Sequence, residues 1–182
     1  MHLLIVNGPN LNMLGTREPE VYGTDTLVDL ERRWRRHASR RGIGVRTFQS
    51  NHEGDIIDRL QTEGGRSDGV ILNPGAYSHT SYAIHDAITS IDTPTVEVHL
   101  SNIHDREPWR AVSVTAPAAD LMIYGRGPVG YLNAIDHLWA SLTVPPRTLA
   151  YGPAPDQVID LRSPSSPRGL AVLIHGGFWR QQ

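Results

Sequence analysis

The sequence predicts an α/β fold in which a parallel sheet lies between layers of helices. Short apolar runs alternate with longer amphipathic runs along the chain, a pattern typical of strands joined by crossover helices. The chain has 182 residues, enough for one domain of ordinary size that buries about two-thirds of its unfolded surface without disulfides or metals. We therefore expect one α/β domain with an appended segment.

The predicted elements follow one another along the chain. Strand-like runs lie at 3–7 (LLIVN), 44–49 (GVRTFQ), 69–73 (GVILN), 94–100 (PTVEVHL) and 121–124 (LMIY). Helix-like segments lie near 25–41, 54–64, 79–90 and 130–142, the first beginning at Thr24 or Asp25 as a cap and ending at Gly42. Right-handed crossovers between five such strands indicate a flavodoxin-like three-layer sandwich with strand order 2-1-3-4-5.

Composition excludes several classes of chemistry. The chain has no cysteine, so a disulfide framework, thiolate catalysis and a cysteine-based zinc site are excluded. All 17 basic residues are arginine, so no mechanism that forms an imine with a lysine is available.

No apolar run reaches the ~18 residues that span a bilayer, and no signal-type segment opens the chain, so we expect a cytoplasmic protein without membrane partners. Six arginines between 32 and 41 are typical of a solvated helix face, and nucleic acid is not an expected partner.

Polar, glycine-containing segments follow three of the predicted strands. They are NGPN (7–10), NPGAYSHTS (73–81) and HLSN (99–102). In parallel sheets ligands bind outside the carboxyl ends of the strands, so these segments predict a pocket. Each has a structural alternative: Asn10 can satisfy a turn, Thr80 can cap a helix, and His99 can be a core histidine bonded to backbone.

Glu97 and His99 are two residues apart on the fourth strand, so both side chains point to the same face. A carboxylate beside an imidazole can fix its tautomer, which makes His99 a candidate general acid. A metal site formed with His104 is the alternative, but no HxH or HExxH spacing supports it. The GRGPVG run at 125–130 matches a dinucleotide-binding pattern, but it follows the last strand and is interpreted as a tight turn.

Four motifs, taken together, resemble one family. NGPNLNMLGTREPEVYGT, QSNHEGDIID, NPGAYSHTS and VEVHLSNIHDRE, in this order, resemble the type II 3-dehydroquinate dehydratases over about residues 2–141. The resemblance implies a flavodoxin-like lyase of the shikimate pathway that converts 3-dehydroquinate to 3-dehydroshikimate without metal or cofactor. It also implies a homododecamer built as a tetramer of trimers. The unrelated type I enzymes use a lysine imine, which this chain cannot form.

The resemblance also implies catalytic roles at matching positions. Tyr22 is expected to take a proton from the carbon beside the substrate ketone, giving an enolate. Since a free tyrosine has a pKa near ~10, the permanent charge of Arg17 would favour the phenolate. Asn10 is expected to hold the water that stabilises the enolate oxygen. His99 is expected to protonate the departing hydroxyl, with Glu97 orienting it.

Substrate binding is implied at a second set of matching positions: Asn73, Gly75, His79, Leu100, Ser101 and Arg110, with Asp86 reaching the site of a neighbouring subunit. The planar fork of Arg110 suits a carboxylate, although a surface ion pair is its structural alternative. Glycines at 15 and 23 bracket the Tyr22 segment, and we expect this segment to close over bound substrate.

Two segments depart from the family pattern. Between 111 and 124 the family usually shows His-Ser shortly after the position of Arg110, whereas this chain reads RAVSVTAPAADLMIY. Residues 145–182 lie beyond the predicted dehydratase domain at 1–144, and their HGGFW run at 175–179 resembles the start of an α/β-hydrolase of the esterase or formamidase type. No GxSxG nucleophile follows, so an esterase is a weak alternative. The stronger alternative is a non-catalytic flavodoxin-like module that binds a small molecule in the same pocket.

Overall fold

The computed structural model describes residues 1–16, 24–143, 147–150, 152–154 and 157–161. The chain divides into two compact units, Met1–Trp139 and Ala140–Gln182, and each is described by itself. The predicted boundary between 144 and 145 stays a prediction.

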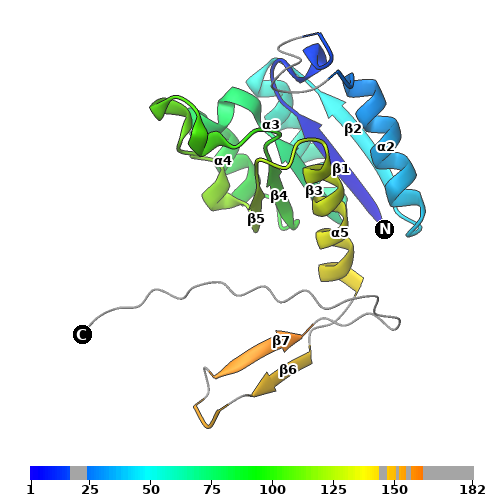
Figure 1. Cartoon of the computed structure of the whole chain (residues 1–182), viewed down its shortest axis with the longest axis vertical. Helices are drawn as coiled ribbons and strands as arrows, with labels where there is room; N and C mark the ends of the chain where they lie inside the picture. Colours follow the sequence, from blue (N-terminus) through cyan, green and yellow to red (C-terminus); the bar gives the residue numbers. More distant parts are fainter. Residues whose placement is uncertain (17–23, 144–146, 151, 155–156, 162–182) are drawn as a thin grey trace. The chain divides into compact units, whose positions relative to one another are not determined.

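The first unit is built on a five-stranded parallel sheet in the order β2-β1-β3-β4-β5 (Figure 1). Its strands are β1 (His2–Asn7), β2 (Gly44–Gln49), β3 (Gly69–Asn73), β4 (Thr95–Val98) and β5 (Leu121–Ile123). The predicted flavodoxin-like order is therefore confirmed. β1 and β3 are buried almost throughout, as expected for central strands covered on both faces.

Helices cover both faces of this sheet, and each face has its own apolar core. α2 (Leu27–Ser39) and α5 (Val129–Thr143) pack on one face, against Leu3, Ile5 and Ile71. α3 (Glu53–Thr62) and α4 (Tyr82–Thr89) pack on the other, against alternate residues of the same strands. On the first face the rings of Trp34 and Tyr131 stack with centroids 4.2 Å apart.

Capping sets where the helices begin. The first helix starts two residues later than predicted, because Thr26 rather than Thr24 or Asp25 caps it. Thr26 accepts from the Asp29 backbone, and the Asp29 carboxylate accepts from the Thr26 backbone and hydroxyl. These hydrogen bonds, assisted by nearby arginines, hold the pKa of Asp29 below its ordinary value.

The predicted helix at 79–90 starts later, at Tyr82, and a separate 3-10 segment precedes it. The 3-10 segment is η3 (Gly75–His79), and α4 follows with Ser81 as its cap.

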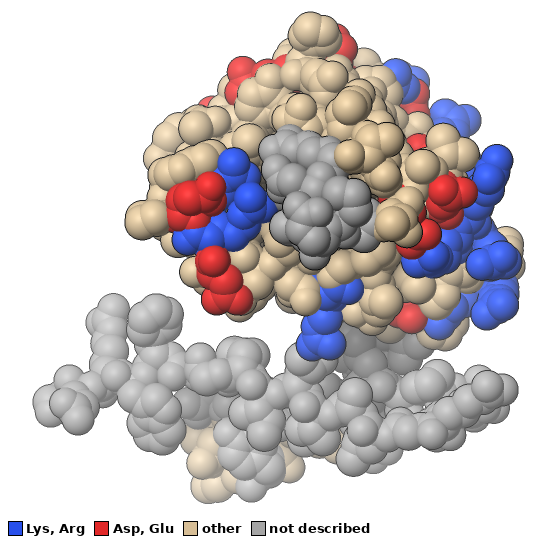
Figure 2. All heavy atoms as spheres, turned by 45° about the horizontal axis from the view of Figure 1, so that its top comes forward, with Lys and Arg blue, Asp and Glu red and all other residues tan. Residues whose placement is uncertain are grey.

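Arginines of α2 form ion pairs with acidic residues such as Asp25 and Asp29. Basic and acidic side chains are interspersed on the face shown in Figure 2.

The second unit contains a short antiparallel hairpin that the sequence analysis did not predict. Its strands are β6 (Arg147–Ala150) and β7 (Val158–Leu161). The HGGFW run at 175–179 and the apolar segment before it lie outside the described residues. No helix among the described residues is long and apolar enough to cross a membrane.

Candidate active site

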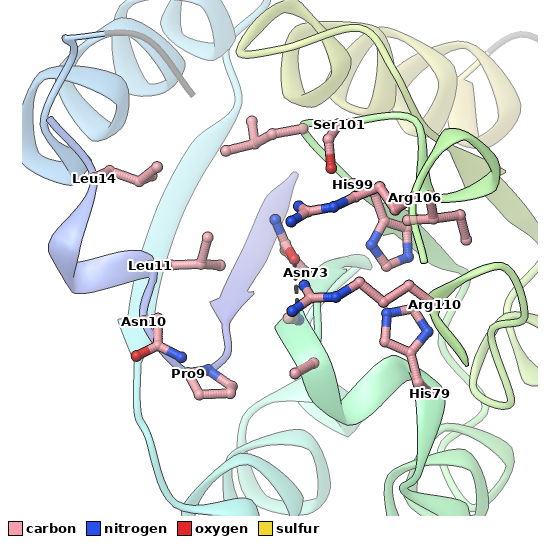
Figure 3. Close-up of a pocket in the computed structure, with 14 residues that line it drawn as sticks. Pro9, Asn10, Leu11, Leu14, Asn73, His79, His99, Ser101, Arg106 and Arg110 are labelled. Atoms are coloured by element: carbon pink, nitrogen blue, oxygen red, sulfur yellow. Dashed lines mark hydrogen bonds between the residues drawn. The ribbon is translucent and has the colours of Figure 1, made fainter. Parts of the chain in front are cut away.

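A cavity of about 130 Å³ lies at the carboxyl edge of the sheet, where β1, β3 and β4 end. Its walls come from the three polar segments that the sequence singled out, together with the loop after β4 (Figure 3). The lining residues are Pro9, Asn10, Leu11, Leu14, Asn73, Gly75, Ala76, His79, His99, Leu100, Ser101, Ile103, Arg106 and Arg110. The expected pocket is therefore present, with leucines on one side and cationic or hydrogen-bonding groups on the other.

Two glycines let the loops after β1 and β3 pack directly on each other. The Gly8 amide donates to the Asn73 carbonyl at 2.7 Å, and a Cβ at Gly8 would lie 2.5 Å from the Pro74 oxygen. Gly75 has a φ of +59°, and a Cβ there would lie 3.0 Å from the Pro9 oxygen. Side chains at either position would push apart two walls of the pocket.

His99 and Glu97 form a buried pair beneath the pocket. His99 Nε2 lies 2.7 Å from Glu97 Oε1, and the two side chains are 6% and 0% exposed. A carboxylate only accepts hydrogen bonds, so Nε2 carries a proton and Nδ1 is the ring nitrogen left for the pocket. His99 lines the cavity, whereas Glu97 lies behind it and touches the pocket only through His99.

Two hydroxyl groups complete the surroundings of the Glu97 carboxylate. Ser113 donates to Oε1 at 2.6 Å, and Thr115 donates to Oε2 at 2.6 Å. Both belong to the segment at 111–124 that departs from the family pattern. The departure therefore leaves the carboxylate fully hydrogen-bonded, which a buried charge requires.

The loop after β4 brings two guanidinium groups to the pocket. The Arg110 guanidinium carbon lies 4.2 Å from the ring centre of Trp109, and Nε lies 3.1 Å from Glu107 Oε2 without hydrogen-bond geometry. Arg106 also lines the cavity, with Nε 3.7 Å from the same carboxylate. The pKa of Glu107 is lowered by a backbone hydrogen bond and by both arginines. The cationic wall suits an anionic ligand.

His79 faces this wall from η3. Its Nδ1 lies 2.7 Å from the Val112 carbonyl, so Nδ1 donates and Nε2 is left for a ligand. Trp109 packs edge-on against the same ring, with centroids 5.7 Å apart. His79 is thus held on two sides in one orientation.

Asn10 reaches the pocket from a strained position. Asn10 is the one described non-glycine residue with positive φ, at 67°. Its backbone N–H donates to Asn51 Oδ1 at 2.9 Å. Gln49 also donates to Asn51 Oδ1, at 3.1 Å, and to the Gly8 carbonyl, at 3.3 Å. The QSN run after β2 therefore braces the loop that carries Asn10.

The structure brings together most of the predicted site residues. Asn10, Asn73, Gly75, His79, His99, Leu100, Ser101 and Arg110 all line the cavity. Tyr22 and Arg17 lie outside the described residues. Asp86 is on α4 with a side chain 83% exposed, outside the pocket of its own chain.

Arg106, Asn51, Ser113 and Thr115 were missed by sequence reasoning. Arg106 had a signal, since it lies in the HDRE run at 104–107, four residues before Arg110. Asn51 lies in the QSNHEGDIID motif, but its bond to the Asn10 backbone could not be read from the sequence. Ser113 and Thr115 act through Glu97 and had no local signal. Among the described residues, no group of three or more His, Cys, Asp or Glu side chains could hold a metal ion.

Comparison with known proteins relates residues 1–139 to the family described as dehydroquinase class II. A 3-dehydroquinate dehydratase from Dinoroseobacter shibae is 52% identical over 143 residues, 79% of this chain and 95% of the relative. A catabolic 3-dehydroquinase from Aspergillus oryzae is 51% identical over 136 residues, 75% of this chain and 89% of the relative.

Solved structures give the same relationship. The crystal structure of the type II dehydroquinase from Butyrivibrio crossotus matches with a TM-score of 0.74 and 45% identity, covering 76% of this chain and 97% of that one. The two proteins are therefore similar in amino-acid sequence as well as in fold.

Proposed function

We propose that the cavity at the sheet edge is the active site of this chain, which belongs to the class II dehydroquinase family. The chain dehydrates 3-dehydroquinate to 3-dehydroshikimate, a step of the shikimate pathway. The observation that carries the assignment of the site is the buried His99–Glu97 pair, which presents one ring nitrogen to a cavity rich in cationic and hydrogen-bonding groups. The reaction removes a proton from the carbon beside the ketone and a hydroxyl from the next carbon.

The proposed acid is His99. As the enolate collapses to restore the ketone, its electron pair forms the new carbon–carbon double bond and the carbon–oxygen bond to the hydroxyl breaks. The departing oxygen takes a proton from His99 Nδ1 and leaves as water, so His99 ends neutral. Glu97 is well placed to orient the His99 ring, because its carboxylate accepts the Nε2–H at 2.7 Å.

The proposed base is Tyr22, assisted by Arg17; both assignments rest on the family resemblance. The phenolate takes the proton from carbon, and solvent then carries it back so that His99 is recharged. Asn10 is proposed to hold the water that stabilises the enolate oxygen. Tyr131 is not an alternative base, because it is buried and does not line the pocket.

Recognition of the substrate is assigned to the groups around the cationic wall. Arg110 is proposed to bind the substrate carboxylate, because Trp109 and Glu107 hold its guanidinium and its forked end remains for a ligand. The hydroxyl and ketone oxygens are assigned to Asn73, His79 and Ser101, with Gly75 and Leu100 shaping the walls. These groups need no cofactor.

Assembly is a further part of the proposal. We assign the chain a homododecamer, a tetramer of trimers, in which Asp86 of one subunit reaches the site of another. Its exposure on α4 is compatible with that role. The similarity of 145–182 to the start of an α/β-hydrolase remains a hypothesis about this segment, and the family match ends before it. A cytoplasmic location likewise remains a proposal.

The experiment is to follow the ultraviolet absorbance of the conjugated enone product on adding 3-dehydroquinate to the full chain. We expect turnover in the wild type, at least a hundredfold loss of kcat in His99→Ala, and unchanged activity after borohydride treatment with substrate. A His99→Ala variant that keeps wild-type kcat would overturn the assignment of the acid. Substrate binding without any turnover by the wild type would instead favour the non-catalytic binding module.

A further inference from the structure

A buried chain of hydrogen bonds lies directly behind the pocket. The Tyr131 hydroxyl on α5 lies 2.7 Å from Asn7 Oδ1 and 2.9 Å from Asn73 Nδ2. Asn7 and Asn73 are the last residues of β1 and β3, and both are buried, at 0% and 3% exposure. Of these residues only Asn73 lines the cavity.

A backbone N–H group determines which atoms donate and which accept in this series of hydrogen bonds. The Gly75 amide, which can only donate, lies 3.1 Å from Asn73 Oδ1 (Figure 3). The oxygen of the Asn73 side chain must therefore face Gly75, and its nitrogen must face Tyr131. Tyr131 then accepts from Asn73, so its single proton goes to Asn7. The orientation of Asn73 is not an assumption, because reversing its side chain would set two donors against each other at Gly75.

The environment of the Tyr131 hydroxyl favours its protonated form. Burial raises the pKa of Tyr131 well above its ordinary value, and the hydrogen bond from Asn73 lowers it to a smaller extent. The ring is fixed as well, since it stacks on Trp34 with an interplanar angle of 18°. The Tyr131 oxygen is thus a stationary acceptor.

We infer that Tyr131 is a positioning residue that orients Asn73, so that the second N–H of this side chain faces the pocket and donates to an oxygen of the substrate; the inference rests on the proposed function. Gly75 and Tyr131 hold the two ends of the amide, so it cannot turn. The Asn73 side chain has two N–H groups, and one is used by Tyr131. The other is presented as a donor to the hydroxyl, ketone or carboxylate oxygens of the substrate.

The test is a double-mutant cycle on the full chain, assayed with 3-dehydroquinate. Tyr131→Phe keeps the ring and its stacking on Trp34 but removes the hydroxyl. We expect KM to rise about tenfold with kcat within about twofold of wild type, because the Asn73 contact exists both before and during the reaction. In an Asn73→Ala background the same substitution should change kcat/KM by less than about twofold, because the group that it orients is gone.

Thr93→Val is the matched control. Its hydroxyl donates to the Gly64 carbonyl at 3.1 Å, before β4 and therefore at the opposite edge of the sheet. It should lower the melting temperature and leave kcat and KM unchanged. Tyr131→Phe overturns the inference if KM stays at the wild-type value, if only kcat falls, or if the loss is the same in the Asn73→Ala background.

A second variant decides the matter if Tyr131→Phe does not fold. Asn73→Asp keeps the acceptor for the Gly75 amide but has no N–H for Tyr131 or for the substrate. Its KM should rise as much as that of Asn73→Ala, and a wild-type KM would overturn the inference. An inactive wild-type chain would instead count against the proposed function, and the two failures are therefore distinguishable.

Discussion

Replacing Thr115 by valine tests how much the hydroxyl groups around Glu97 contribute. Thr115 is fully buried, and its hydroxyl lies 2.6 Å from Glu97 Oε2. No other described group donates to that oxygen, whereas Oε1 keeps Ser113 and His99. Valine has nearly the same shape, so the change leaves no large cavity; it removes the hydrogen bond to the buried Glu97 carboxylate and a longer contact, 3.1 Å, with the Ser113 hydroxyl.

Hydrogen bonds to charged groups contribute about 1.5–3 kcal/mol, so we expect Thr115→Val to lower the free energy of unfolding by about 2 kcal/mol. For a chain of this size that corresponds to a fall in Tm of roughly 4–8 °C. We also expect kcat to fall about tenfold, because a carboxylate with one free oxygen holds His99 less firmly. Thermal unfolding by circular dichroism and the enone absorbance assay measure the two effects.

Thr95→Val is the control for this prediction. Thr95 is also buried on β4, but its hydroxyl donates to a neutral acceptor, the Thr93 carbonyl, at 3.0 Å. It should cost about 1 kcal/mol and leave kcat unchanged. Equal destabilisation by the two substitutions, with wild-type kcat in Thr115→Val, would refute the reasoning about the charged acceptor.

Three further predictions concern the loops and the first helix. Gly8→Ala should abolish activity, because its Cβ would lie 2.5 Å from the Pro74 oxygen; wild-type kcat/KM would contradict the close packing. Asn51→Ala should lower kcat about tenfold by releasing Asn10, with little change in Tm; an unchanged kcat would remove Asn51 from the site. Asp29 has a lowered pKa, so its stabilising effect is present above its ordinary value of 3.8 and is lost as pH falls through the lower folded-state value. The stability difference between wild type and Asp29→Asn should therefore shrink in acid, and a difference that grows there would contradict the sign.

Much of the fold could be predicted because the signals are local. The buried strands β1 and β3 appear as continuous apolar runs, and right-handed crossovers fix their order. Boundaries were less accurate where a side chain decides them, as at Thr26 and Ser81, whose hydroxyls cap α2 and α4. The β6–β7 hairpin was missed although its strands flank a glycine- and proline-rich turn.

The site was predictable only where it lies at strand ends. His99 and Asn73 follow apolar strands in segments whose polarity a buried core does not explain. Thr115 and Tyr131 gave no such signal. Thr115 lies 18 residues beyond Glu97 in an irregular segment, and Tyr131 falls on the apolar stripe of a helix, where a core role is the natural interpretation. Their contacts with Glu97, Asn7 and Asn73 join residues far apart in the chain, and a single sequence does not reveal such contacts.

The chemistry of the described pocket bears on where the base must come from. The described lining residues include two arginines and two histidines but no carboxylate and no tyrosine. With His99 proposed as the acid, His79 is the one described alternative base, with Nδ1 already donating to Val112. A cationic pocket stabilises an anionic base and the enolate that the base generates. It destabilises a neutral imidazole base, because the imidazole becomes positively charged on taking a proton. The electrostatics of the described walls therefore favour Tyr22, as a phenolate, over His79.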